Sequence, residues 1–418
     1  MKHIEKLNVR FNDQDVGTLH LAERGKIYFS YSNKWLKNGF NLSPFDLKMD
    51  LSLQSPKDNL FSGLHGVFAD SISDGWGLML TDRALQKKFK WEKREINQLD
   101  RLFFIGSRAM GGLEYFPHDK SDNNPSEIFD IESIYEETQK IIFGEKEEII
   151  KELYLSGGSP GGARPKAVFA RNKDNFVSGY NKIPTNYSAW LIKFFSEDDS
   201  KSIGKIEKAY SDMAKDCGIY MPETDLIHVK IKNKPYSFFA IERFDRTNEK
   251  RIHCVSLSGL TYASHRLPSI SYEDIYLVTN QLCNNNKEIN RLTDIMLFNI
   301  ICHNKDDHSK NFSFQYMNNS WQLTPSYDLV YSSSLGNEHM TDIGGNGNPN
   351  YNDIQNLTKK FDIKDINEKM DNIIEVANNW KEYANKYDIP KSEVNSINDS
   401  LQSIILRLNK QKTLKIKI

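Results

Sequence analysis

The alternation of apolar and polar residues gives the start of the chain a strand-rich character. Residues 6–36 alternate in short runs separated by Asn-Asp and Arg-Gly turns, which predicts several strands. Residues 74–89 have helical spacing, and residues 99–116 predict an apolar helix, a glycine pair and a strand. The polar, turn-rich stretch 117–125 is typical of a linker. We therefore expect a separate N-terminal subdomain at residues 1–116.

Strands and helices alternate in the middle of the chain. The apolar runs are four to eight residues long where turns bound them, and longer where the spacing is helical. These patterns predict a second domain at residues 117–245 that contains a sheet. The expected elements are a helix within 128–155, strands at 167–172 and 188–195, a helix at 203–218 and a hairpin at 225–246.

After residue 246 the pattern becomes mainly helical. Residues 272–283 and 291–302 have helical apolar spacing. A long loop rich in Asn and Gly follows at 336–353, and residues 361–409 predict two or three amphipathic helices. The third expected domain is a helical lobe at residues 246–418, and the fold class of the whole chain is α+β.

Composition narrows the functional classes. The 418 residues are 39% hydrophobic and 27% charged, which is ordinary for a globular protein, and the net charge is −1. No global basic field therefore favours nucleic acid or a membrane surface. The four cysteines are scattered without zinc spacing and are expected to be reduced thiols. With no signal-peptide pattern and no apolar run of about 18 residues, we expect a cytoplasmic protein with no membrane partner.

The strongest chemical signal is a polar loop directly after the apolar helix at 291–302. Asp306 and Asn311 are five residues apart, which is the interval of a kinase catalytic loop in which Asp handles the acceptor hydroxyl and Asn holds a metal ion. Asp328 follows a predicted hairpin, where a second metal carboxylate is needed. Asp306 fits the interval and Asp307 does not, although Asp307 could stabilise the turn. His308 either orders the loop or has a purely structural role.

A glycine-rich loop precedes a strand upstream. Gly161 and Gly162 would let backbone N–H groups approach an anion, and Lys166 follows at the end of the loop. A P-loop needs Gly-Lys-Ser/Thr at the start of a helix, whereas Ala167 follows here and a strand is predicted. The pattern favours a kinase-type loop that covers the phosphates of a nucleotide. A glycine-rich turn without any ligand is the alternative.

Three further features occur in kinase order. Lys193 lies in an apolar strand, where an amine is costly unless it is paired or used. Glu207 lies near the start of the next helix and suits an ion pair with Lys193. Residues 242–244 leave a strand where backbone groups could meet an adenine base. The alternatives are a lysine that reaches water from an edge strand and a solvated first-turn glutamate.

In combination, these motifs resemble the HipA family of bacterial toxin serine/threonine kinases from type II toxin–antitoxin modules. The resemblance is clear from about residue 150 to 335, and the module that ends in FFIGSRAMGGLEYFP resembles the N-terminal subdomain of the family. In contrast to eukaryote-type kinases, no His-Arg precedes Asp306. The segments that carry the resemblance are residues 159–166 (SPGGARPK), 190–193 (WLIK), 242–246 (ERFDR), 306–311 (DDHSKN) and 325–329 (PSYDL).

The resemblance implies a HipA-like fold with a strand-rich N-terminal subdomain, a nucleotide lobe that contains a sheet and a mostly helical C-terminal lobe. It implies that Asp306 is the catalytic acid/base, that Asn311 and Asp328 hold Mg²⁺, and that Lys193 contacts the ATP phosphates and pairs with Glu207. The residues expected at ATP are Gly161, Gly162, Ala163, Arg164, Pro165, Lys166, Lys193, Glu242, Arg243, Phe244, His308, Ser309, Lys310, Asn311, Tyr327 and Asp328.

The resemblance also implies regulation and partners. Ser159 stands where family members autophosphorylate, which ejects the loop and inactivates the kinase. A phosphate carrying nearly two negative charges beside the nucleotide phosphates would repel them. A HipB-like helix-turn-helix antitoxin is the expected partner, with DNA contacted only through it. The substrate would be a protein, with an aminoacyl-tRNA synthetase as the family example.

Two other functions stay open at this stage. The loop around Asp306 also resembles that of phosphoinositide kinases, so a small-molecule or lipid kinase is one alternative. The other is a kinase-shaped co-repressor that binds nucleotide without turnover. The presence of Lys193, Asp306, Asn311 and Asp328 argues against this second alternative.

Overall fold

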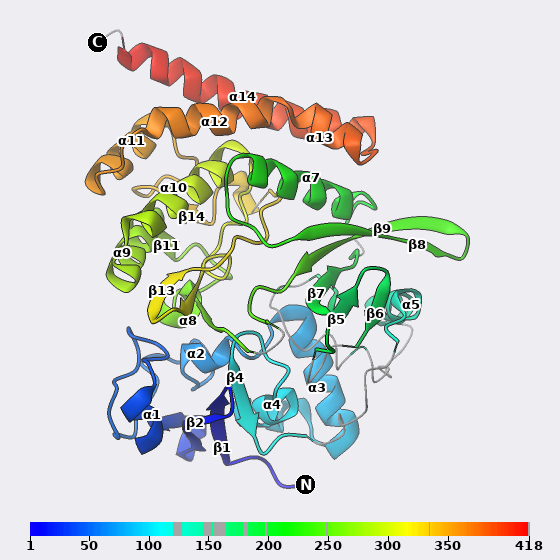
Figure 1. Ribbon diagram of the computed structural model, residues 1–418, viewed down its shortest axis with the longest axis vertical. Helices are drawn as coiled ribbons and strands as arrows, with labels where there is room; N and C mark the ends of the chain where they lie inside the picture. The colour runs from blue at the N-terminus through cyan, green and yellow to red at the C-terminus, as the bar shows by residue number, and fades with distance from the viewer. Residues whose placement is uncertain are drawn as a thin grey trace. The chain divides into compact units, whose positions relative to one another are not determined.

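The chain divides into two compact units in the computed structural model. Figure 1 shows their helices and strands. Unit 1 comprises Met1–Ser200, Ile227–Tyr262 and Gln315–Met317. Unit 2 comprises Lys201–Leu226, Ala263–Phe314 and Asn318–Ile418. The structure describes residues 1–119, 128–144, 153, 162, 164–178, 183–196, 199–247, 250–333 and 335–416.

A four-stranded antiparallel sheet begins unit 1 and confirms the predicted strands. Its strands run in the order β3-β2-β1-β4. Asn12 and Asp13 both have positive φ at the β1–β2 turn, the conformation that a tight hairpin needs and that Asn and Asp tolerate. One face carries alternating apolar residues that are fully buried. The strands are β1 (Lys6–Phe11), β2 (Gln14–Leu21), β3 (Ile27–Tyr31) and β4 (Leu113–Phe116).

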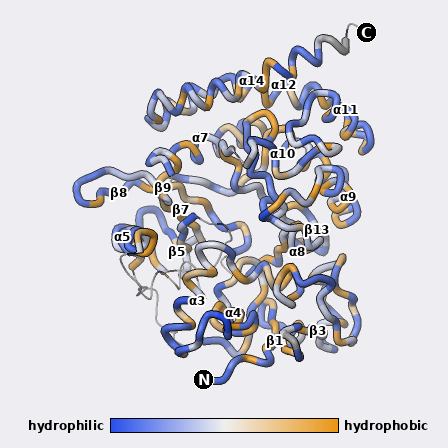
Figure 2. Tube along the Cα trace, turned by 180° about the vertical axis from the view of Figure 1, so that it is seen from behind, coloured by the Kyte–Doolittle hydropathy of each residue, from blue (hydrophilic) through white to orange (hydrophobic). Residues whose placement is uncertain are grey.

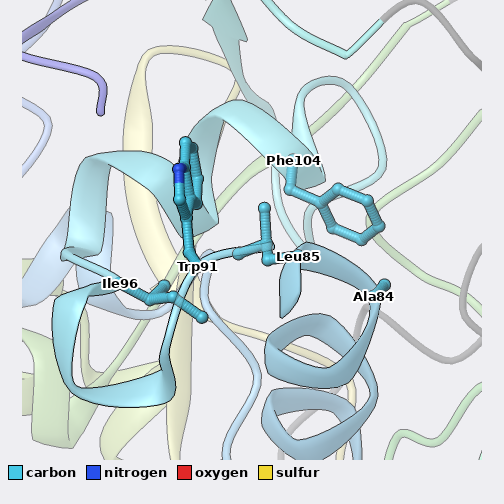
Figure 3. Packing of buried hydrophobic residues seen from close by; sticks show 5 residues of the cluster. All are labelled: Ala84, Leu85, Trp91, Ile96 and Phe104. Carbon is cyan, nitrogen blue, oxygen red and sulfur yellow. The ribbon is translucent and has the colours of Figure 1, made fainter. Parts of the chain in front are cut away.

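Four helices accompany this sheet. The two longest, which were predicted from their spacing, pack together through a buried apolar cluster (Figure 3). The cluster is made of Ala84, Leu85, Trp91, Ile96 and Phe104. The helices are α1 (Asn33–Asn38), α2 (Gly66–Ala69), α3 (Gly75–Phe89) and α4 (Gln98–Ile105), and short 3-10 turns lie at Glu23–Gly25 and Lys93–Glu95.

A second sheet carries the predicted phosphate-binding lysines. Its five strands run in the order β6-β5-β7-β9-β8. Helix α5 (Ile131–Ile142) lies near it, and Tyr135 of this helix packs against Phe194 and Phe238. Lys193, predicted at the centre of a strand, is instead its last residue, because the chain leaves the ladder after it. The strands are β5 (Lys166–Asn172), β6 (Asn175–Val177), β7 (Ser188–Lys193), β8 (Thr224–Ile231) and β9 (Lys234–Glu242). Strand β10 (His253–Ser256) and helix α8 (Leu257–Thr261) also belong to unit 1.

Unit 2 is mainly helical, as predicted. Figure 1 shows α12, α13 and α14 side by side, and Figure 2 shows apolar and polar residues alternating along these helices. Along α14 the buried residues recur every three or four positions, from Val394 to Leu408. The helices are α7 (Ile203–Asp216), α9 (Tyr272–Cys283), α10 (Asn286–Ile301), α11 (Tyr351–Lys360), α12 (Ile366–Asn378), α13 (Trp380–Lys386) and α14 (Lys391–Ile416).

Short strands join these helices. A hairpin, β12–β13, follows α10, and the two-residue strands β11 and β14 pair in parallel. The predicted loop at 336–353 is shorter than expected, because Asn350 caps α11 and the helix begins at Tyr351. Among the described residues, no helix is both long and apolar enough to cross a membrane. The strands are β11 (Ile270–Ser271), β12 (Ser313–Met317), β13 (Ser320–Leu323) and β14 (Thr341–Asp342), with a 3-10 turn at Leu335–Asn337.

Candidate functional site

The predicted catalytic loop is a tight, internally bonded turn after α10. Its backbone turns at His303, which has a φ of 57°. The Asn311 side chain closes the loop, because its Nδ2 donates to the Asp306 carbonyl at 2.6 Å. The backbone N–H of Asp306 donates to Ser332 Oγ at 3.1 Å. The Asp306 side chain is 61% exposed, so its carboxylate is accessible to an incoming substrate.

The structure brings the segment of Asp328 to this same loop. Tyr327 Oη donates to the Lys310 carbonyl at 2.6 Å. Asn304 Nδ2 lies 3.3 Å from the Asp328 carbonyl, which it reaches as a donor. Asp328 has a φ of 54°, a left-handed conformation that Asp tolerates better than most residues. The chain segments that carry Asp306, Asn311 and Asp328 therefore lie next to one another within unit 2.

The side-chain oxygens of Asn311 and Asp328 are of the kind that binds magnesium. Mg²⁺ prefers carboxylate and amide oxygens, and it usually binds through one or two protein ligands together with phosphates and water. Since Nδ2 of Asn311 is used as a donor, its Oδ1 is the atom that can act as a ligand. Asp328 supplies a half-buried carboxylate. The described residues contain no cluster of three or more His, Cys, Asp or Glu suited to a metal.

A small cavity of about 20 Å³ borders the loop. Asn311, Ser326 and Tyr327 are among the residues that line it. The Ser326 Oγ is buried and makes no hydrogen bond within the structure. A cavity of this size can hold one water molecule with polar partners.

The remaining predicted loop residues have different environments. Asp307 is fully buried, and so is Ser309, whose hydroxyl donates to the Ala263 carbonyl at 3.0 Å. His308 Nδ1 accepts from the Lys310 backbone N–H at 3.2 Å, while Nε2 lies 4.0 Å from Asp306 Oδ1. The His308 ring therefore orders the loop and borders the Asp306 carboxylate.

In unit 1, two lysines of the second sheet face each other. Lys166 at the start of β5 pairs in register with Lys193 at the end of β7. Lys193 Nζ lies 5.6 Å from the centre of the Phe239 ring. A Cβ added to Gly162 would lie 2.7 Å from Lys166 Nζ, so this glycine leaves room for the amine.

The glycine-rich loop lies only partly within the described residues. Gly162 accepts a hydrogen bond from the Trp76 backbone N–H at 3.3 Å and donates its own N–H to Asp74, both at the start of α3. Arg164 Nη2 lies 2.9 Å from Asp199 Oδ1. The predicted positions Ser159, Gly161 and Ala163 lie outside the described residues.

The strand exit at 242–244 has a structural role that the sequence did not reveal. The Arg243 guanidinium is buried and bonds to Asp245 at 2.9 and 2.7 Å. Arg246 donates to the carbonyls of Ala109 and Gly111. Burial alone would raise the pKa of Asp245, but the two guanidinium groups hold it well below its usual range.

Several predicted contacts remain predictions after the structure. Glu207 is buried in α7, in unit 2, whereas Lys193 belongs to unit 1, and their ion pair remains an expectation. The Arg243 backbone N–H donates to the Ala189 carbonyl at 2.7 Å within the sheet, and an adenine contact of residues 242–244 remains an expectation. Glu242 is half-buried and pairs in register with Trp190.

The sequence did not identify the polar residues that support the loop. Asn304 Nδ2 donates to Asn299 Oδ1 at 2.9 Å, and Ser332 Oγ donates to Asn304 Oδ1 at 2.9 Å. Asn304 is only two residues before Asp306, and this closeness to a candidate catalytic acid was the one signal that the sequence offered. Asn299 and Ser332 carry no such signal.

Comparisons with known proteins identify the fold and the family. No curated protein matches the sequence significantly. A chain from the Shewanella oneidensis MR-1 toxin–antitoxin complex of HipA, HipB and operator DNA has the same fold, with a TM-score of 0.69, 17% identity and 97% of each chain covered. A chain of the Helicobacter pylori proinflammatory kinase CtkA gives a TM-score of 0.37 at 13% identity, covering 56% of this chain and 94% of that one, a likeness too slight to support a conclusion.

Two family models match the sequence directly. The HipA N-terminal domain matches residues 7–116, and the HipA-like C-terminal domain matches residues 158–402. The second match alone spans more than half of the 418 residues. The chain therefore belongs to the HipA family and has the α+β HipA kinase fold.

Proposed function

We propose that this protein is a HipA-type toxin kinase that transfers the γ-phosphate of ATP to a serine or threonine of a protein. The observation that carries the proposal is that the segments of Asp306, Asn311 and Asp328 meet in unit 2, where Asp306 is exposed and the other two residues have side-chain oxygens suited to a metal. This is the residue set that kinase chemistry requires after the nucleotide lobe.

The proposed reaction assigns one role to each group. The acceptor hydroxyl attacks the γ-phosphorus, the bond to the β–γ bridging oxygen breaks, and ADP leaves. Asp306 orients the hydroxyl and receives its proton. Mg²⁺ held by Asn311 and Asp328 would neutralise phosphate charge. The half-buried side chains of the metal ligands favour this role, because a partly desolvated site strengthens charge interactions.

The lysine pair in unit 1 supports nucleotide binding. Lys166 and Lys193 lie opposite each other on neighbouring strands, an arrangement that brings two positive charges together and suits the binding of a triphosphate. Gly162 leaves space beside the Lys166 amine, which suits close approach by phosphate oxygens. ATP is therefore the proposed nucleotide, with residues 242–244 and the loop at 161–166 as its further contacts.

The proposed regulation follows from family membership. Phosphorylation of Ser159 would place two negative charges near the nucleotide phosphates and stop turnover. The protein whose fold matches was solved with HipB and operator DNA. We propose a HipB-like antitoxin as the partner of this chain, with DNA contact through that partner because the net charge is −1. An aminoacyl-tRNA synthetase is the proposed class of target.

The test is phosphoproteomics after induction of the wild type and of Asp306→Asn. We expect new phosphoserine or phosphothreonine sites and slowed growth with the wild type, and neither with the variant, because the acceptor hydroxyl loses its proton acceptor. Asp399→Asn, which changes an exposed acid on α14, is the matched control and should behave as the wild type.

The other outcomes separate the alternatives. Phosphate transfer by Asp306→Asn at the wild-type rate would reject the site. ATP turnover by purified protein only when a lipid or small molecule is added would favour the small-molecule kinase. Binding of Mg²⁺-ATP with no transfer to any acceptor would favour the idle co-repressor.

A further inference from the structure

The residues on either side of Asp306 are buried while Asp306 is exposed. Lys305 is 5% exposed and Asp307 is 0% exposed. Burial of a lysine and an aspartate is costly unless each has well-placed partners. Both partners come from one segment downstream of Asp328, residues 337–348, which we name the clasp segment.

Lys305 contacts the clasp segment through its amine. Its Nζ donates to the carbonyl and Oδ1 of Asn337, with Oδ1 at 2.9 Å, and to Asn348 Oδ1 at 3.2 Å. These acceptors are all neutral oxygens, and burial lowers the pKa of Lys305. The backbone adds a fourth bond, because the Met340 N–H donates to the Lys305 carbonyl at 3.1 Å.

Asp307 contacts the same segment from the other side. Its Oδ2 accepts from His339 Nδ1 at 2.9 Å, and its Oδ1 accepts from the Thr341 backbone N–H at 3.2 Å. The Thr341 hydroxyl also donates to the Asp307 carbonyl. The clasp segment therefore holds three consecutive residues, 305–307, by their first and last members.

A chain of hydrogen bonds continues from Asp307 to the backbone carbonyl of Asp328. Tyr272 Oη donates to Asp307 Oδ2 at 2.8 Å and accepts from Asn299 Nδ2 at 3.1 Å. Asn299 in turn accepts from Asn304, whose same Nδ2 reaches the Asp328 carbonyl. A shift of the clasp segment would therefore be transmitted to Asp306 through its two neighbours and to Asp328 through this chain of hydrogen bonds.

We propose that Lys305 and Asp307 are positioning residues, and that the clasp segment uses them to fix the Asp306 carboxylate for phosphoryl transfer. The inference rests on the proposed function for its kinetic readout. Since the contacts use neutral oxygens and a histidine ring, the loop is held in place without any modification of the clasp segment. A misplacement of a catalytic group by about 1 Å can lower the rate about a hundredfold, so contacts that fix the Asp306 carboxylate would raise the rate of phosphoryl transfer.

The experiment compares Lys305→Met, Asn348→Ala and Lys359→Met in the full-length protein. Lys359 is an exposed lysine on α11 and is the matched control. We expect Lys305→Met to lower kcat by about tenfold or more and to leave KM for ATP within about twofold, because ground-state nucleotide binding does not use Asp306. Asn348→Ala removes one acceptor and should lower kcat less. The double variant should lose no more than Lys305→Met alone, since both remove one interaction.

Hydrogen exchange provides a readout that needs no turnover. The amides of Met340 and Thr341 donate to Lys305 and Asp307, so they should exchange faster in Lys305→Met and Asn348→Ala and at the wild-type rate in Lys359→Met. Unchanged exchange and unchanged kcat in both clasp variants would overturn the inference. If the wild type transfers no phosphate, the proposed function fails, and the clasp inference is then decided by exchange alone.

Discussion

At the residue scale, His253 predicts how stability depends on pH. Its Nε2–H donates to the Leu42 carbonyl at 2.9 Å in a fully buried site against the Phe40 ring. Burial lowers the pKa of His253 from 6.5 to about 4. Between about pH 6.5 and pH 4 the unfolded chain therefore binds a proton at His253 that the folded chain does not bind. As the pH falls through this window, the free energy of unfolding should decrease by roughly 3 kcal/mol.

His253→Gln is the variant that isolates this effect. Gln can still donate to the Leu42 carbonyl but does not titrate. In urea unfolding between pH 7 and pH 4, we expect the wild type to lose stability more steeply than the variant. Parallel pH profiles for the two proteins would contradict the prediction.

At two neighbouring acids, the sequence interval and the structure distinguish the same residue, although the role of that residue remains a prediction. The five-residue interval from Asp306 to Asn311 separates Asp306 from Asp307 in the sequence, and the structure leaves Asp306 exposed and buries Asp307. The contacts of the Arg243 guanidinium group were not predictable from the sequence. Its guanidinium and that of Arg246 reach a loop more than 130 residues earlier in the chain, and no local pattern encodes such a contact.

At the element scale, α7 is tied to α13 by polar contacts. Asp212 accepts from Lys208 on its own helix, from Lys386 at 3.0 Å and from Tyr387. Tyr383 of α13 donates to Asp216. Burial alone would raise the pKa of Asp212, but these donors lower it, so the carboxylate is charged and well paired. Because α7 carries Glu207, this contact also sets the place of a predicted site residue.

Asp212→Asn should therefore destabilise unit 2. The change leaves two lysines without their charged acceptor, which we expect to lower the free energy of unfolding by about 1–3 kcal/mol. Asp216→Asn is the matched control, since Asp216 accepts from one hydroxyl and should cost less. Urea titration followed by circular dichroism measures both, and an equal loss in the two variants would argue against the assigned role of Asp212.

Elements were predicted well where periodicity is strong, and poorly at their ends. The helix predicted at 272–283 has those bounds, because a Ser271–Asp274 capping box and a left-handed Asn284 define its two ends locally. The end of β7 at Lys193 depends on where the ladder with β5 stops, which is a property of the partner strand. Helix α11 was not predicted at all, because its capping asparagine lies in an Asn/Gly-rich sequence that indicates a loop.

At the scale of the whole molecule, the two family domains do not coincide with the two compact units. Residues 7–116 match one family model, yet unit 1 also takes in Ile227–Tyr262, which belongs to the other match. Buried polar contacts join these parts. They include His253 with Leu42, Arg246 with Gly111, and Asp70 with the N–H and hydroxyl of Ser256 at 2.6 and 2.8 Å. The sequence shows the family boundary but not these long-range contacts.

The isolated N-terminal family domain should therefore be incomplete. A fragment of residues 1–117 lacks the partners of Asp70 and of the loop at 107–112, and it exposes the Phe40 ring that His253 covers. We expect a lower melting temperature and fast amide exchange in that loop, relative to the full-length chain. Joining residues 243–262 through a flexible linker should restore part of both, and Asp245→Asn in the joined protein should remove the gain, because Arg243 and Arg246 lose their common carboxylate. A fragment as stable as the full chain would mean that these contacts contribute little to the N-terminal domain.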